Sequence, residues 1–67
     1  MGVVKVIELV GTSRQNWTDA VDNAVREASR TIDHILGVEV TNFTANIEDG
    51  NISEYKADVK IAFHVHH

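Results

Sequence analysis

Residues 55–65, Tyr-Lys-Ala-Asp-Val-Lys-Ile-Ala-Phe-His-Val, decide the fold because apolar and polar side chains alternate along them. The apolar members all carry odd numbers: Tyr55, Ala57, Val59, Ile61, Phe63 and Val65. The even positions are polar or charged, with Ala62 as the exception. A period of two places the two sets on opposite faces of a β-strand. The segment therefore predicts a strand with one buried face and one wet face.

The preceding segment predicts a second strand joined to the first by a tight turn. In residues 38–47 the apolar residues change parity between Val40 and Phe43, and a bulge near Thr41 and Asn42 explains this in one bent strand. The sequence Glu-Asp-Gly-Asn at 48–51 contains an Asp-Gly pair, which is typical of a two-residue hairpin turn.

The first part of the chain predicts a strand followed by a helix. Residues 3–10 are mostly β-branched or aliphatic, and this strand is expected to end at Gly11. Two helix N-caps are possible: the hydroxyls of Thr12 and Ser13, or Asn16 with Asp19 three residues later. Helical spacing then relates the following apolar residues: Trp17, Ala20, Val21, Ala24, Val25, Ala28, Ile32 and Ile35. Gly37 is expected to end the helix with a positive φ, close to His34.

The order of these elements predicts the fold class. A β-α-β-β chain of the α+β class forms a fully antiparallel sheet only if the first strand pairs with the third. We expect strand order 1-3-2, one helix across one face, and a single domain over residues 1–67. The strand edge and the apolar residues Val4, Val6 and Val10 are left for association with other copies.

Length and composition favour self-association and exclude several classes of function. A 67-residue chain without cysteine has a small core and no disulfide to stabilise it. Six scattered basic residues and a formal net charge of −4 argue against nucleic-acid binding. No apolar run is long enough to span a membrane, and no signal peptide is evident, so a cytoplasmic protein is expected.

The residues that carry chemistry do not predict an enzyme. Ser13 lacks the glycine elbow of a nucleophile and is interpreted as a capping residue. His64, His66 and His67 could ligate a transition metal, but terminal fraying or a purification tag explains them more simply. Glu39, Glu54 and Asp58 are oxygen donors of the kind that calcium prefers, although their spacing matches no EF-hand. In one protomer they are interpreted as surface charge, which a symmetry axis could gather into a cation site.

Taken together, these segments resemble the dodecin family. The resemblance lies in Glu-Leu-Val-Gly-Thr-Ser at 8–13, the alanine-rich helix, Val-Glu-Val at 38–40, the 48–50 turn, and Glu-Tyr at 54–55. It covers nearly the whole chain. It implies a β-α-β-β protomer that assembles into a hollow homododecamer with the helices outside.

The resemblance also implies a flavin site, from which this sequence departs twice. The family stacks paired flavins between tryptophans just after the helix, and that position is Gly37 here. A glutamine on the last strand contacts the flavin edge, and that position is Lys56. An aromatic ring buries about 150–250 Å², so its loss removes much of the affinity for flavin.

The expected function is therefore binding or storage of a small ligand or ions in a non-enzymatic shell. The chain resembles the flavin-independent members of the family, some of which are associated with calcium, and a divalent cation is the expected occupant. The alternative is storage and sequestration of riboflavin or FMN. A third possibility is a purely structural assembly or an adaptor for another protein.

Overall fold

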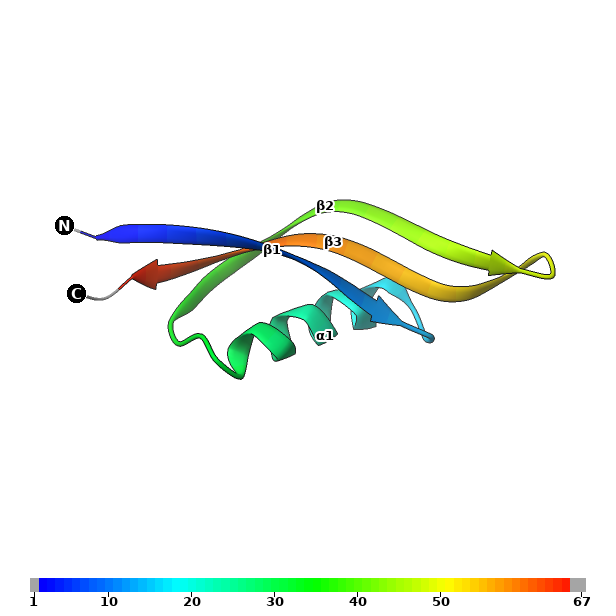
Figure 1. Cartoon of the computed structure of the whole chain (residues 1–67), viewed down its shortest axis with the longest axis horizontal. Coiled ribbons are helices and arrows are strands. Elements are labelled where there is room, and N and C mark those ends of the chain that lie inside the picture. Colours follow the sequence, from blue (N-terminus) through cyan, green and yellow to red (C-terminus); the bar gives the residue numbers. More distant parts are fainter. Residues whose placement is uncertain (1, 66–67) are drawn as a thin grey trace.

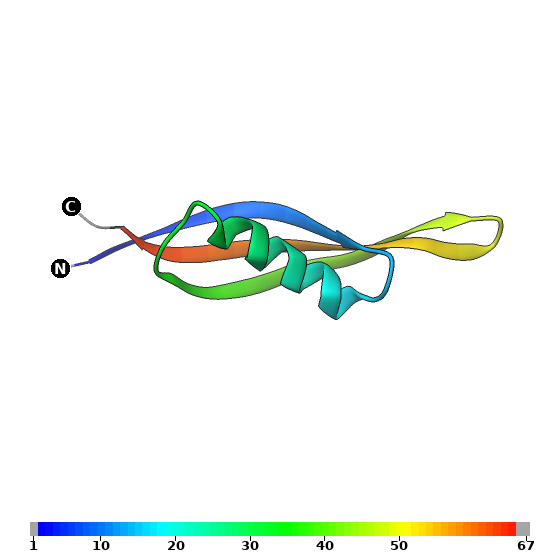
Figure 2. The ribbon, with the colours of Figure 1, turned by 90° about the horizontal axis from the view of Figure 1, so that it is seen from below.

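The computed structural model describes residues 2–65 and contains one helix and three strands in the predicted order (Figure 1). These elements are β1 (Val3–Ser13), α1 (Trp17–Ser29), β2 (Ile35–Glu48) and β3 (Asn51–Val65). The sheet order is β1-β3-β2, and both strand pairs are antiparallel, as predicted. The helix covers one face of the sheet, while the β2–β3 hairpin extends past its first turn (Figure 2).

The core lies between α1 and the centre of β3. Its buried members are three helix alanines, Ala20, Ala24 and Ala28, and three strand residues, Ala57, Val59 and Ile61. The predicted odd-numbered face of β3 is therefore the face that the helix covers. Alanine is small, so the helix lies close to the sheet. The two largest fully buried side chains are Ile61 and Val59.

The first strand is longer than predicted, and the expectation that it ends at Gly11 is wrong. Gly11 is opposite Ala57, and pairing continues to Ser13 opposite Tyr55. The glycine has a packing role here. A Cβ at Gly11 would lie 2.0 Å from the carbonyl oxygen of Ala20. Gly11 therefore allows the helix backbone to approach β1.

The helix begins at the second of the two predicted caps. Asn16 has an extended backbone, and its side chain accepts a hydrogen bond of 2.7 Å from the Asp19 N–H. Ser13 instead orders the preceding turn: its buried hydroxyl accepts from the Gln15 N–H at 2.9 Å and donates to Asp19 Oδ2 at 2.6 Å. The Ser13 hydroxyl thus has structural partners on both sides.

Removal of the Asn16 cap provides a test of this assignment. Asn16→Ala leaves the Asp19 N–H without its acceptor and should lower the free energy of unfolding by about 1 kcal/mol. Urea denaturation followed by circular dichroism measures this loss. Gln15→Ala is the matched control because that side chain is exposed. Equal unfolding midpoints for the two variants would show that Asn16 is not the cap.

The end of the helix differs from the prediction by about two turns. The helix ends at Ser29, and the Thr31 and Ile32 N–H groups both donate to the Ala28 carbonyl. His34, with φ 60°, occupies the left-handed region that was predicted for Gly37. Ile35 pairs with Phe63 in β2, so strand pairing prevails over the helical spacing of the sequence.

Gly37 itself is a strand residue. It is opposite Ala62, next to a register irregularity between Ile35 and Gly37, and its φ is not positive. A Cβ at this position would meet no atom within 4 Å.

The bulge and the hairpin turn are confirmed. The register of β2 shifts between Val40 and Asn42, which leaves Thr41 as the extra residue. The Thr41 hydroxyl donates to the Asp58 carbonyl at 3.2 Å. Asp49 and Gly50 have φ of 51° and 78°, so both central residues of the turn are left-handed, as in a type I′ hairpin turn.

The protomer has a large surface for its mass. A monomeric protein of 7.4 kDa exposes about 4,200 Å², whereas this chain exposes 4844 Å². Its radius of gyration is 13.7 Å, against about 11 Å for a compact chain of 67 residues. Val4, Val6 and Val10 are exposed, as predicted. The large exposed surface and the large radius of gyration both favour association with other copies of the chain.

The remaining two observations concern the outermost pair of the β1–β3 ladder and the length of the helix. Val3 is paired with Val65, so the start of β1 and the end of β3 lie side by side at one end of the sheet (Figure 1). No helix within residues 2–65 has the length and apolar character that crossing a membrane requires.

Candidate functional site

The predicted site residues lie on the face of the sheet that α1 does not cover, here called the open face. On β3 this face carries the even-numbered residues, because the odd-numbered ones pack against the helix. Direct cross-strand partners share a face, so the register extends the open face to both neighbouring strands. Its charged members are Glu8, Glu39, Glu48, Glu54, Lys56, Asp58 and Lys60.

A row of alternating charge crosses all three strands. Lys60 is opposite Glu8 on one side and Glu39 on the other. One lysine is thus flanked by two glutamates in the register, and the row keeps a net negative charge. Over the strands of the open face five carboxylates stand against two lysines. This arrangement attracts cations.

Glu39, Glu54 and Asp58 are not brought together within the protomer. Asp58 is opposite Asn42, and Glu54 is opposite Asn46, whose side-chain amide donates to Glu54 Oε1 at 3.4 Å. The three carboxylates therefore occupy different rows of the sheet. In the part of the chain that the structure describes, no three His, Asp or Glu side chains form a group that could hold a metal. Each protomer offers these carboxylates singly.

The two positions that match the flavin-contacting residues are also separated within one protomer. Lys56 lies between Thr12 and Thr44, and Gly37 is opposite Ala62. Six residues of β3 separate the two rows, which corresponds to about 20 Å along the strand. A ligand shorter than this distance cannot touch both positions in one chain.

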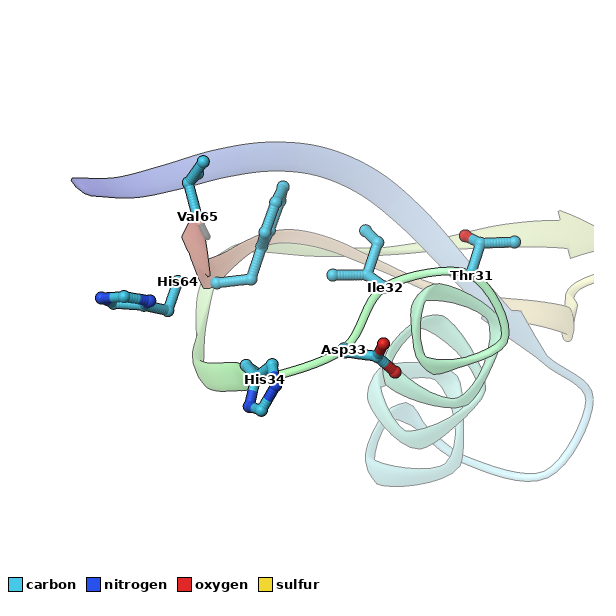
Figure 3. Close-up of a pocket in the computed structure, with 7 residues that line it drawn as sticks. Thr31, Ile32, Asp33, His34, His64 and Val65 are labelled. Atoms are coloured by element: carbon cyan, nitrogen blue, oxygen red, sulfur yellow. The ribbon is translucent and has the colours of Figure 1, made fainter. Parts of the chain in front are cut away.

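A cavity of about 330 Å³ lies where the connection from α1 enters β2 (Figure 3). Its lining consists of Thr31, Ile32, Asp33, His34, Phe63, His64 and Val65. The His64 N–H donates to the His34 carbonyl at 3.2 Å, which joins the two segments through the backbone. The two imidazole rings extend in different directions from this connection (Figure 3). His66 and His67 lie outside the described residues.

An aromatic cluster near the helix start was not predicted from the sequence. The Trp17 indole N–H donates to the Thr44 carbonyl at 2.8 Å. The ring meets Tyr55 edge to face at a centroid distance of 4.8 Å, and Phe43 at 6.2 Å. These residues come from α1, β2 and β3, and only the strand register shows that they meet. The alternating pattern of β3 placed Tyr55 on the correct face but could not identify its partners.

These features define a class of protein: a small β-α-β-β chain whose open face carries charge and whose candidate residues lie apart from one another within the chain. Comparison with known proteins identifies the family. The family model described as Dodecin matches residues 3–66, so the chain belongs to the dodecin family.

Individual relatives cover almost the whole chain. A dodecin of Thermus thermophilus is 31% identical over 91% of this chain and 88% of its own length. The structure of dodecin from Streptomyces coelicolor has a TM-score of 0.96 and 35% identity, covering 98% of this chain and 94% of that one.

A calcium-binding relative is also similar. The calcium dodecin of Mycobacterium tuberculosis is 29% identical over 94% of this chain and 89% of its own length. Its crystal structure, which is described as having a novel calcium-binding site, has a TM-score of 0.84 and covers 96% of this chain and 91% of that one.

Proposed function

We propose that this protein is a non-enzymatic, cytoplasmic homododecamer that binds divalent cations such as calcium between its subunits and binds flavin weakly or not at all. The excess of carboxylates on the open face carries this proposal. Twelve protomers at −4 each would give a total of about −48, which concentrates cations around the assembly. The calcium dodecin among its relatives supports the choice of calcium.

Symmetry is the means by which single carboxylates would become a site. Calcium takes six to eight oxygen ligands, more than any one protomer supplies from Glu39, Glu54 or Asp58. Copies of the same carboxylate around an axis would supply several at once. Glu39 is exposed, which leaves it accessible to such an arrangement.

Calcium should stabilise the assembled protein. At a free calcium concentration of 100 times Kd, each occupied site contributes about 2.7 kcal/mol, so the melting temperature should rise. Differential scanning calorimetry with and without calcium, at constant ionic strength, measures this shift. Glu39→Gln and Asp58→Asn should reduce it.

Glu27→Gln is the control, because Glu27 lies on the helix and pairs with Arg30 at 3.1 Å. It removes one negative charge per chain without touching the open face. A melting temperature that is unchanged at millimolar calcium would contradict the cation proposal. An equal effect in all three variants would mean that total charge, and not the open face, is responsible.

Flavin storage remains the second candidate because Lys56 keeps a hydrogen-bond donor at the family's flavin-edge position. In the register Lys56 is opposite Thr12 on β1 and Thr44 on β2. Titration with riboflavin, followed by quenching of flavin fluorescence, distinguishes the two functions. Stoichiometric quenching at micromolar flavin would favour storage of flavin over binding of cations.

A further inference from the structure

The turn between β2 and β3 places an aspartate directly before a glycine at the far end of the hairpin (Figure 1). This pair, Asp49-Gly50, is the only place in the chain where a glycine follows an aspartate or an asparagine. The side-chain carboxyl carbon of an aspartate and the backbone nitrogen of the next residue can close a small ring, a succinimide. The pair therefore has a chemical reactivity in addition to its turn geometry.

Both reacting groups of the pair are accessible. Asp49 and Gly50 are exposed. A Cβ built on Gly50 would meet no atom within 4 Å, so the space beside this residue is open. Glycine has no Cβ of its own, and nothing in the residue obstructs the approach of the carboxyl group to its nitrogen.

Neither reacting group is held by a partner in the part of the chain that the structure describes. The Asp49 carboxylate forms no hydrogen bond or ion pair there, and the Gly50 N–H donates to no acceptor. The Asn51 side-chain amide donates to the Asp49 carbonyl at 3.3 Å. That carbonyl belongs to the same peptide group as the Gly50 N–H. The hydrogen bond polarises the peptide group and favours loss of the nitrogen's proton during an attack.

The other four aspartates lack this combination, because a residue with a side chain follows each of them: Asp19, Asp22, Asp33 and Asp58. The Ala20 N–H, which follows Asp19, already donates to the Asn16 carbonyl at 3.2 Å. Val59, which follows Asp58, is β-branched and fully buried. The turn is therefore the place in the described chain where the reaction is least obstructed.

We propose that Asp49 is a site of spontaneous modification, at which aspartate isomerises to isoaspartate in the folded protein. The Gly50 nitrogen attacks the neutral carboxyl group of Asp49, a bond forms between the nitrogen and Cγ, and the nitrogen's proton and the carboxyl hydroxyl leave as water. Water then opens the succinimide. Cleavage of the bond to Cγ restores aspartate, whereas cleavage of the bond to the backbone carbonyl leaves the chain running through Cγ. One water is released and one is consumed, so the mass of the protein does not change.

Isomerisation would lengthen the turn. The isoaspartyl backbone contains an extra methylene group, whereas a type I′ turn accommodates two ordinary residues. The Glu48–Asn51 pair closes the hairpin and should open first. The hairpin extends beyond α1, so the core between the helix and β3 should keep its structure (Figure 2).

Incubation of the intact wild-type protein for several weeks near neutral pH tests this inference. Digestion followed by electron-transfer mass spectrometry distinguishes isoaspartate from aspartate at each position, and a sample taken at the start corrects for isomer that forms during handling. Isoaspartate at Asp49 should exceed that at Asp33 or Asp58 roughly tenfold, because only Asp49 precedes a residue without a Cβ.

Two variants keep the turn and change the chemistry. Asp49→Gly gives a pair that a type I′ turn accepts but has no carboxyl group, so it should remove the excess of isoaspartate. An isoaspartate-specific methyltransferase with labelled S-adenosylmethionine measures the total isoaspartate that remains. Asp49→Asn gives another favoured turn pair and should accumulate isoaspartate faster, since a side-chain amide loses ammonia more readily than a carboxyl group loses water.

Two results would overturn the inference. One is isoaspartate at Asp49 that does not exceed the level at the other aspartates. The other is isoaspartate that forms at Asp49 in urea but not in the folded protein, which would show that the turn keeps the carboxyl group away from the Gly50 nitrogen. Neither measurement depends on calcium or flavin, so the inference stands or fails separately from the proposed function.

Discussion

Gly11→Ala should abolish stable folding. The added Cβ would lie 2.0 Å from the Ala20 carbonyl oxygen and 2.9 Å from the Ala24 Cβ. Neither atom belongs to a flexible side chain, so α1 would have to move away from β1. Overpacking costs about 1–3 kcal/mol where side chains can adjust, and a backbone contact this close should cost at least the upper end of that range. The small core provides little reserve against such a loss.

Circular dichroism and urea denaturation measure this effect. Gly37→Ala is the control, since a Cβ there meets nothing within 4 Å and the residue has no positive φ. The control should unfold at the same urea concentration as the wild type or slightly higher, because alanine reduces the entropy of the unfolded chain. A Gly11→Ala protein with the wild-type midpoint would refute the close contact between helix and strand.

Gly37→Trp should create tight flavin binding in the assembled protein. The space around Gly37 accommodates a side chain, and the family resemblance places the flavin-stacking tryptophan at this position. A ring that buries 150–250 Å² and stacks on the flavin should improve affinity by about 100-fold, after allowance for the cost of ordering the side chain. The expected result is stoichiometric quenching of riboflavin fluorescence at concentrations where the wild type shows none.

Val38→Trp is the matched control for this gain. Val38 is the next residue of β2 and is opposite Ile61, so it lies on the helix side of the sheet. A new ring at Val38 should not stack on a flavin at the open face. If Gly37→Trp also fails to bind riboflavin while keeping the wild-type mass, Gly37 does not correspond to the flavin position.

The strands were predictable from the sequence because their signals are local. The alternation in β3, the parity change at Thr41 and the Asp-Gly pair each act within a few residues. The strand order then followed from the need for antiparallel pairing. The helix end was not predictable, because Ile32 and Ile35 keep helical spacing although they lie in the connection and in β2. Both still pack against the core, so the apolar pattern was correct and the conformation was not.

The candidate site was predictable only as separate residues. Glu39, Glu54 and Asp58 were recognised as oxygen donors, and the register now places them in separate rows of one face. The contacts of Trp17 with Phe43 and Tyr55 depend on the register of two distant strands, which no local pattern specifies. Sites that form between protomers are still harder to predict from the sequence, because they also depend on the symmetry of the assembly.

The pairing of Val3 with Val65 also determines how the protomer would respond to a mechanical load. Tension applied to its two ends would open the β1–β3 ladder from that pair inward, rupturing its hydrogen bonds one after another instead of shearing them together. Resistance to pulling along this direction should therefore be small for a single subunit, whatever its thermal stability. Handles for single-molecule force measurements would have to be attached elsewhere, for example at the hairpin turn, to load the sheet along its strands.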